Sequence, residues 1–244
     1  MRKGWLMAGL MLICGAVWAD DASLRRQAEV IVFGDILAAS SLGHFKTNPP
    51  PEDQRSLRLA YSTLYTVEMA MAYLGEPPAQ AESLIKIKAL LTKLEALDES
   101  ERAQYPELLQ HLLNEHQHMR VMAMQAYRDM APEEHAFETK IVKLGQNVSE
   151  LLIDYQLRFY PEVNSIKRPY TEAHLKELIA EIDAGFNELM QRDLGATRKI
   201  FAQYRFVRNQ ILPIREQPIS GVDFYLARVI TDLLDLTKEN DFGT

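Results

Sequence analysis

The chain has 244 residues, of which 27 are basic and 34 acidic, so its formal net charge is −7, and 47% of its residues are hydrophobic. This length is sufficient for one sizeable core or two small ones. The acidic balance argues against binding to nucleic acid or to an anionic membrane surface, because both need basic patches. It is compatible with a basic protein partner or a cation.

The first segment of the chain predicts export. Arg2 and Lys3 form a basic start, residues 4–17 form an apolar run, and small residues at Val17 and Ala19 occupy the positions that a signal peptidase reads. This is the layout of a signal peptide over residues 1–19 that is cleaved after Ala19. The apolar run is shorter than the roughly 20 residues that a membrane-spanning helix needs.

The use of cysteine narrows the expected compartment. Cys14 is the only cysteine and lies inside the predicted leader, so the mature chain forms no disulfide. An exported chain without cysteine fits the periplasm of a Gram-negative bacterium. Ile13 precedes Cys14 where a lipoprotein signal has a small residue, which argues against lipid anchoring. Without the leader, 25 basic and 34 acidic residues remain, and the net charge becomes −9.

Helical periodicity dominates the mature chain, and alternating strand patterns are almost absent. We expect one all-α domain over residues 20–244, with a semi-separate N-terminal layer of helices over residues 20–98. Its fold would be an elongated bundle of six to seven mostly antiparallel helices. In chain order, the expected helices cover residues 23–42, 51–74, 80–97, 106–130, 132–159, 171–212 and 220–236, with a turn or short capped helix at 98–101.

Three of these segments carry more specific expectations. The β-branched run Val30–Phe33 is interpreted as part of a first helix that is buried on most sides. The short link near Pro132 predicts a long antiparallel hairpin at the centre of the bundle, over residues 105–160. The segment 171–212 forms either one continuous helix or a helix with a kink near residues 193–195.

Three side chains on one face of the fourth helix are the candidate metal ligands: His111, Glu115 and His118. Glu115 and His118 have the Glu-x-x-His spacing of di-iron bundles, but a second such pair does not occur in the chain. A mononuclear site would need one of these pairs and a ligand from another helix, such as His135 or Glu138. The alternative is a solvated polar face.

His116 differs from these residues because it occupies a core-facing position of the same helix. The length of the expected hairpin places it opposite Asn147 and Ser149, either of which would satisfy it by hydrogen bonding. The alternative role is a buried pH switch. Asp35 and Glu68 also lie among apolar residues. They are either buried acids or, as we expect, half-exposed acids at the edge of the apolar side of their helices.

A basic and aromatic stripe, formed by Arg198, Phe201, Arg205 and Arg208, is the candidate surface for an anion or an acidic partner. The alternative is that these arginines form ion pairs with acids of neighbouring helices.

No catalytic motif is recognisable, since the chain lacks a phosphate-binding glycine loop, His-Glu-x-x-His and Gly-x-Ser-x-Gly. The sequence therefore favours a non-enzymatic periplasmic binding protein of the partner-binding, inhibitor, chaperone or immunity type. We expect another protein as partner, no cofactor, no nucleic acid and no membrane span after cleavage. The alternatives are a metal-binding bundle that uses His111, Glu115 and His118, and a small-ligand sensor near His116 and Arg205. An enzyme whose site is assembled from distant residues stays open.

Overall fold

The computed structural model describes residues 4–46, 54–130, 136–160, 171–191, 195–212, 219 and 221–239. Within them the chain forms eight α-helices and one 3₁₀ helix, and no strand, which confirms the all-α prediction. The elements are α1 (Gly4–His44), α2 (Arg55–Tyr73), α3 (Pro78–Ala96), η1 (Glu99–Gln104), α4 (Tyr105–Met130), α5 (Ala136–Leu157), α6 (Glu172–Met190), α7 (Gly195–Ile211) and α8 (Val222–Glu239).

The second half of α1 is the central helix of the bundle. Val30, Ile31, Val32 and Ile36 are fully buried, and few residues between 24 and 45 reach solvent. A helix that is apolar on all sides is stable in water only when other helices surround it. Helices α2, α4, α5 and α8 all pack against α1. The β-branched run at residues 30–33 is therefore helical, as predicted.

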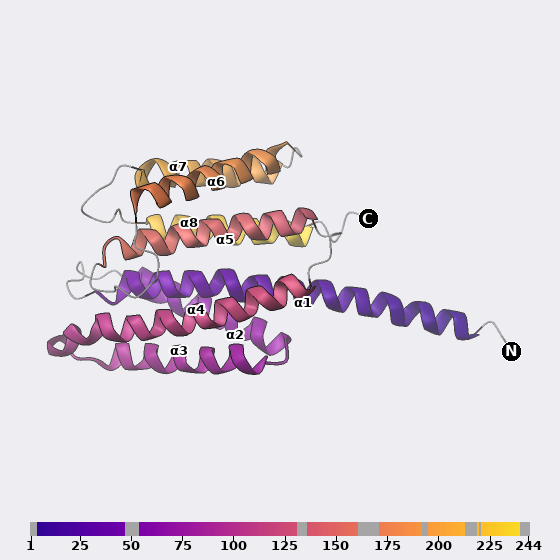
Figure 1. Ribbon diagram of the computed structural model, residues 1–244, viewed down its shortest axis with the longest axis horizontal. Coiled ribbons are helices and arrows are strands. Elements are labelled where there is room, and N and C mark those ends of the chain that lie inside the picture. The colour runs from indigo at the N-terminus through magenta and orange to yellow at the C-terminus, as the bar shows by residue number, and fades with distance from the viewer. Residues whose placement is uncertain are drawn as a thin grey trace.

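The helices are arranged as stacked pairs (Figure 1). Helix α3 packs on α4, α1 packs on α2 and α4, α5 packs on α8, and α6 and α7 cover the far side of the α5–α8 pair. The first turns of α1 project beyond the end of this stack (Figure 1). Within the described residues, no helix combines the length and the apolar character that crossing a bilayer requires.

The expected hairpin over residues 105–160 is not formed as such. Helices α4 and α5 follow one another in the chain, but each packs against α1 and not along the other (Figure 1). The reason is that α1 has apolar side chains on every side, and inserting it between α4 and α5 buries more of them than direct α4–α5 packing would.

The segment 171–212 is neither continuous nor kinked: it forms two antiparallel helices. Phe186 of α6 stacks on Tyr204 of α7, with ring centroids 5.1 Å apart, and Asp183 of α6 pairs with Arg208 of α7. The apolar residues that recur at helical spacing along this segment are all buried: Leu175, Leu178, Ile182, Leu189, Ile200, Tyr204, Val207 and Ile211. A period of three to four residues is the same in one long helix and in two short ones, so it does not reveal the reversal.

After the third helix, where a turn or a short capped helix is expected, the chain forms the short capped helix η1. Asp98 and Glu101 form a capping box at the start of η1, in which each side chain bonds the backbone N–H of the other residue. In α2, Leu64 and Met71 are buried, whereas Tyr61, which follows the same helical spacing, is 39% exposed.

Candidate functional site

Two features outside ordinary apolar packing stand out: an exposed aromatic surface on α7 and α8, and a buried carboxylate in α1. The first is built by Phe206 of α7 and by Phe224 and Tyr225 at the start of α8, which are 55%, 52% and 41% exposed. Phe206 and Phe224 each make an edge-to-face contact with Tyr225, with ring centroids 5.6 and 5.7 Å apart. We call these three rings, together with Phe201 and Arg205, the α7–α8 surface.

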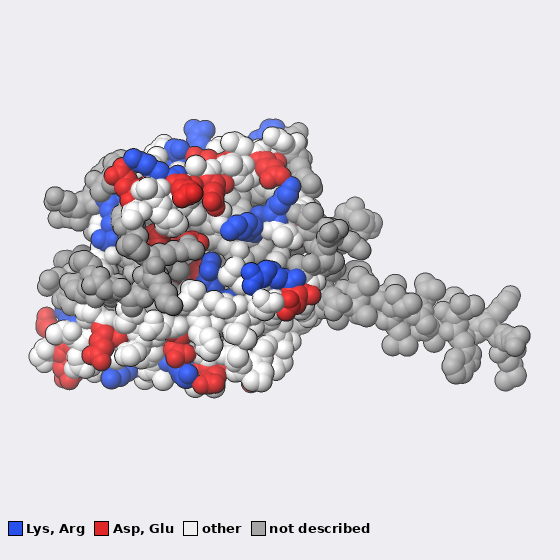
Figure 2. Space-filling model, in the orientation of Figure 1, with Lys and Arg blue, Asp and Glu red and all other residues white. Residues whose placement is uncertain are grey.

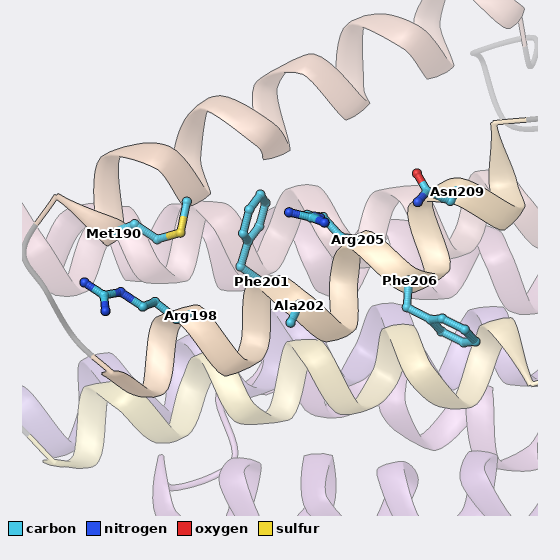
Figure 3. Close-up of a pocket in the computed structure, with 7 residues that line it drawn as sticks. All are labelled: Met190, Arg198, Phe201, Ala202, Arg205, Phe206 and Asn209. Carbon is cyan, nitrogen blue, oxygen red and sulfur yellow. The ribbon is translucent and has the colours of Figure 1, made fainter.

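The outward side of α7 also forms a shallow depression of about 340 Å³. Figure 3 shows Met190 at the end of α6 and six α7 residues around it: Arg198, Phe201, Ala202, Arg205, Phe206 and Asn209. The spacing of these α7 residues is that of one helix face. The opposite side of α7 is buried through Ile200, Tyr204 and Val207, which fixes the orientation of the outward face.

The arginines of the predicted stripe have different environments. Arg208 forms an ion pair with Asp183, with Nη2 2.7 Å from the carboxylate oxygen, as expected of a structural arginine. Arg205 is exposed, and its guanidinium lies 5.7 Å from the ring centre of Phe201, without a carboxylate partner among the described residues. The stripe is therefore divided: Arg208 stabilises the α6–α7 pair, while Arg205 presents a positive charge beside the ring of Phe201.

The wider surface shows no dominant sign of charge on the side drawn in Figure 2, where acidic and basic side chains alternate over the described residues. In this acidic chain, a guanidinium that lies beside the Phe201 ring and pairs with no carboxylate of the described residues favours the approach of a carboxylate and an apolar group together.

The buried feature is centred on Asp35 of α1, whose side chain is fully enclosed. Nε2 of His116 lies 2.8 Å from Oδ1, and Nε of Arg120 lies 3.1 Å from the same oxygen and donates its hydrogen to Oδ2 over 3.3 Å. Ser149 of α5 donates its hydroxyl hydrogen to Oδ2 over 2.6 Å. One carboxylate thus joins α1, α4 and α5.

Burial alone would raise the pKa of the Asp35 carboxyl. The Arg120 charge and the hydrogen bonds from His116 and Ser149 outweigh burial and hold the pKa of Asp35 below its ordinary value. The same proximity raises the pKa of Arg120 above its usual range, with Glu150 adding to the effect. Asp35 is therefore a charged carboxylate inside the protein, compensated by its neighbours.

The residue types of this cluster are those of a catalytic triad, but their roles differ. Ser149 donates to the Asp35 carboxylate, whereas the serine of a Ser-His-Asp triad donates to its histidine. Asp35 has no exposed area, and the His116 side chain is only 6% exposed, so a substrate does not reach either group. The geometry is that of a structural network.

The predictions for these buried residues were partly right. His116 is a paired core histidine, as expected, but its partner is Asp35 and not Asn147 or Ser149. Ser149 is linked to His116 through the Asp35 carboxylate, because it bonds the other oxygen of that group. The expectation of a half-exposed Asp35 is wrong, whereas Glu68 is indeed half-exposed and pairs with Lys88.

The candidate metal ligands are not gathered. His111 and His118 are exposed, Nδ1 of His118 lies 3.3 Å from the Ser83 hydroxyl, and Glu115 lies 3.4 Å from Nζ of Lys86. Among the described residues, no group of three or more histidine, cysteine or acidic side chains is placed to hold a metal ion. His135 lies outside the described residues.

Sequence reasoning missed Phe224 and Tyr225, because their exposure depends on where α8 begins relative to α7. Comparison with protein-family models, with curated proteins and with solved structures gave no match. Function is therefore argued from the geometry of this chain alone.

Proposed function

We propose that the protein is a non-enzymatic binding protein and that its α7–α8 surface docks another protein. The observation that carries this proposal is the cluster of three exposed aromatic rings next to Arg205, a cation without a carboxylate partner among the described residues. Exposed aromatic side chains and arginine are enriched at the energetically important centres of protein interfaces.

The surface also suits binding because it is already ordered. Phe206, Phe224 and Tyr225 support one another through ring contacts, and Arg205 rests on the Phe201 ring. A partner that meets preordered side chains loses less conformational entropy than one that must order them. The depression beside Phe206 would receive one side chain of the partner.

The charge of Arg205 favours a partner segment that carries a carboxylate next to an apolar or aromatic residue. We propose that this encounter takes place in the periplasm, after cleavage of the leader at Ala19. N-terminal sequencing of the protein from a periplasmic fraction tests this location. A chain that starts at Asp20 supports export, and an intact precursor in the cytosol contradicts it.

The binding proposal is tested by comparing charge-reversed variants in a pull-down from periplasmic extract. Arg205→Glu places a negative charge at the centre of the α7–α8 surface, whereas Arg128→Glu makes the same change on an exposed position of α4. We expect a protein that is captured by the wild type and by Arg128→Glu but lost with Arg205→Glu. Equal capture by all three chains would contradict the proposed surface.

A further inference from the structure

A second exposed stripe runs along α2, on the side of this helix opposite its buried residues. Tyr65, Met69 and Tyr73 are 64%, 51% and 53% exposed, and Tyr61 continues the stripe at 39%. With Arg58 at its start, the stripe stays within an arc of about 120° and extends about 22 Å along the helix axis. Singly exposed apolar residues are ordinary, but four large ones in line form a surface.

Two of these rings are held in place. The hydroxyl of Tyr61 donates to Glu95 of α3, and the guanidinium of Arg26 lies 5.2 Å from the ring centre of Tyr73. Burial and the nearby Glu95 carboxylate raise the pKa of Tyr61 to about 12, so its hydroxyl stays protonated as a donor. The stripe is therefore preordered for contact with a flat helical surface.

We propose that this stripe pairs with the same stripe of a second copy, with the two α2 helices antiparallel. A twofold interface must be complementary to itself, so each residue has to suit the residue that the symmetry places opposite it. If the twofold symmetry axis passes level with Val67, Tyr61 lies opposite Tyr73 of the second copy, and Tyr65 lies opposite Met69 of the second copy.

The charges at the two ends of the stripe agree with this register. The register places Arg58 of one copy level with the turn that carries Glu76 of the other. Both side chains are exposed, and neither forms an ion pair with any described residue of its own chain. A parallel arrangement would instead place each Arg58 against its own equivalent, which is unfavourable.

The α2 stripe shares no residue with the α7–α8 surface, although the two helices α2 and α8 touch where the Ser56 hydroxyl donates to Asp223 over 2.9 Å. If the α2 stripe does not form a dimer, the proposal that the α7–α8 surface docks another protein still stands. The two proposals are distinguished by matched variants: Tyr65→Glu places a charge in the α2 stripe, and Tyr225→Glu makes the same substitution in the α7–α8 surface.

The test combines solution mass with directed disulfides. Sedimentation of the wild type and of Tyr225→Glu should give a dimer mass as concentration rises, while Tyr65→Glu, with an unchanged helical circular dichroism spectrum, stays monomeric. A monomeric wild type at every concentration, or a dimeric Tyr65→Glu, would overturn the proposal.

The register is tested in chains that carry Cys14→Ser. A mixture of Tyr61→Cys and Tyr73→Cys chains should form a disulfide between the two variants. Each variant alone should not form one, because like positions lie about 18 Å apart along the antiparallel axis and a disulfide needs Cα atoms within about 7 Å. Disulfides within one variant only would contradict the antiparallel register.

Discussion

Asp35 is the residue on which the packing of three helices converges. Its two oxygens accept hydrogen bonds from His116 and Arg120 of α4 and from Ser149 of α5. Such a network does not add much stability compared with apolar packing, but removing one member leaves the others buried without compensation. It also restricts how α1, α4 and α5 fit together, since only one arrangement satisfies every member.

Replacing the carboxylate should therefore cost more than replacing the histidine. We predict that Asp35→Asn lowers the free energy of unfolding by about 3–5 kcal/mol, because it leaves the Arg120 charge largely buried and unpaired. His116→Leu should cost about 1–3 kcal/mol, because Arg120 and Ser149 still bond the carboxylate. Urea unfolding measures both values, and the reverse order would contradict the assigned roles. His116→Leu should keep partner binding, since His116 lies far from solvent.

The lowered pKa of Asp35 also predicts a dependence of stability on pH. A carboxyl whose pKa is lower in the folded than in the unfolded protein stabilises the fold above the unfolded value of about 3.9. This contribution is lost as the pH falls from that value through the folded pKa. We expect the wild type to lose stability below about pH 4 more steeply than Asp35→Asn. Parallel stability curves for the two proteins in acid would contradict the ionised state of Asp35.

At the scale of elements, the close approach of α1 and α4 depends on a glycine beside the buried acid. A Cβ at Gly34 would lie 3.1 Å from the terminal methyl of Met119 and 3.7 Å from Cδ2 of His116. The neighbouring Asp35 thus reaches His116 because the helices meet where α1 has no side chain.

We predict that Gly34→Leu destabilises the protein by about 1–3 kcal/mol, because the added carbons must displace Met119 and His116. Gly195→Leu is the control, since nothing lies within 4 Å of a Cβ built at that position. Thermal unfolding should show a clearly lower midpoint for Gly34→Leu alone. Equal midpoints for the two variants would show that the α1–α4 contact is not as tight as described.

Local patterns in the sequence predicted the elements better than their partners. The periodicity of residues 106–130 identified the bounds of α4 to within one residue and placed His116 in the core. It did not reveal that α1 separates α4 from α5, because the pattern of one helix shows which side is buried and not which helix buries it. For the same reason the sequence did not reveal Asp35 as the partner of His116, since the two lie 81 residues apart.

The sequence likewise predicted part of the α7–α8 surface but not the partners of its residues. Helical spacing identified Arg198, Phe201 and Arg205 as neighbours, and all three line the depression on α7. Spacing alone did not separate Arg205 from Arg208, because the difference depends on Asp183 in another helix. Pairing between distant segments is the part of the structure that an amphipathic pattern does not contain.

At the scale of the whole molecule, the protein is a helical stack that presents two exposed surfaces, the α2 stripe and the α7–α8 surface. The α2 stripe is uncharged at its centre and complementary to itself, which suits a second copy. The α7–α8 surface contains Arg205, which has no carboxylate partner in the described part of the chain, and it suits a different, acidic partner. The network around Asp35 lies in the core and holds the stack that presents both surfaces.

The measurement that tests the proposed function most directly is photo-crosslinking in the cells that make the protein. A photoreactive phenylalanine analogue replaces Phe206, which is 55% exposed in the α7–α8 surface, or Val121, which is 47% exposed on α4. The account predicts one dominant protein adduct at position 206 that is lost with Arg205→Glu and does not form at position 121. The absence of an adduct at 206, or the same adducts at both positions, would contradict it.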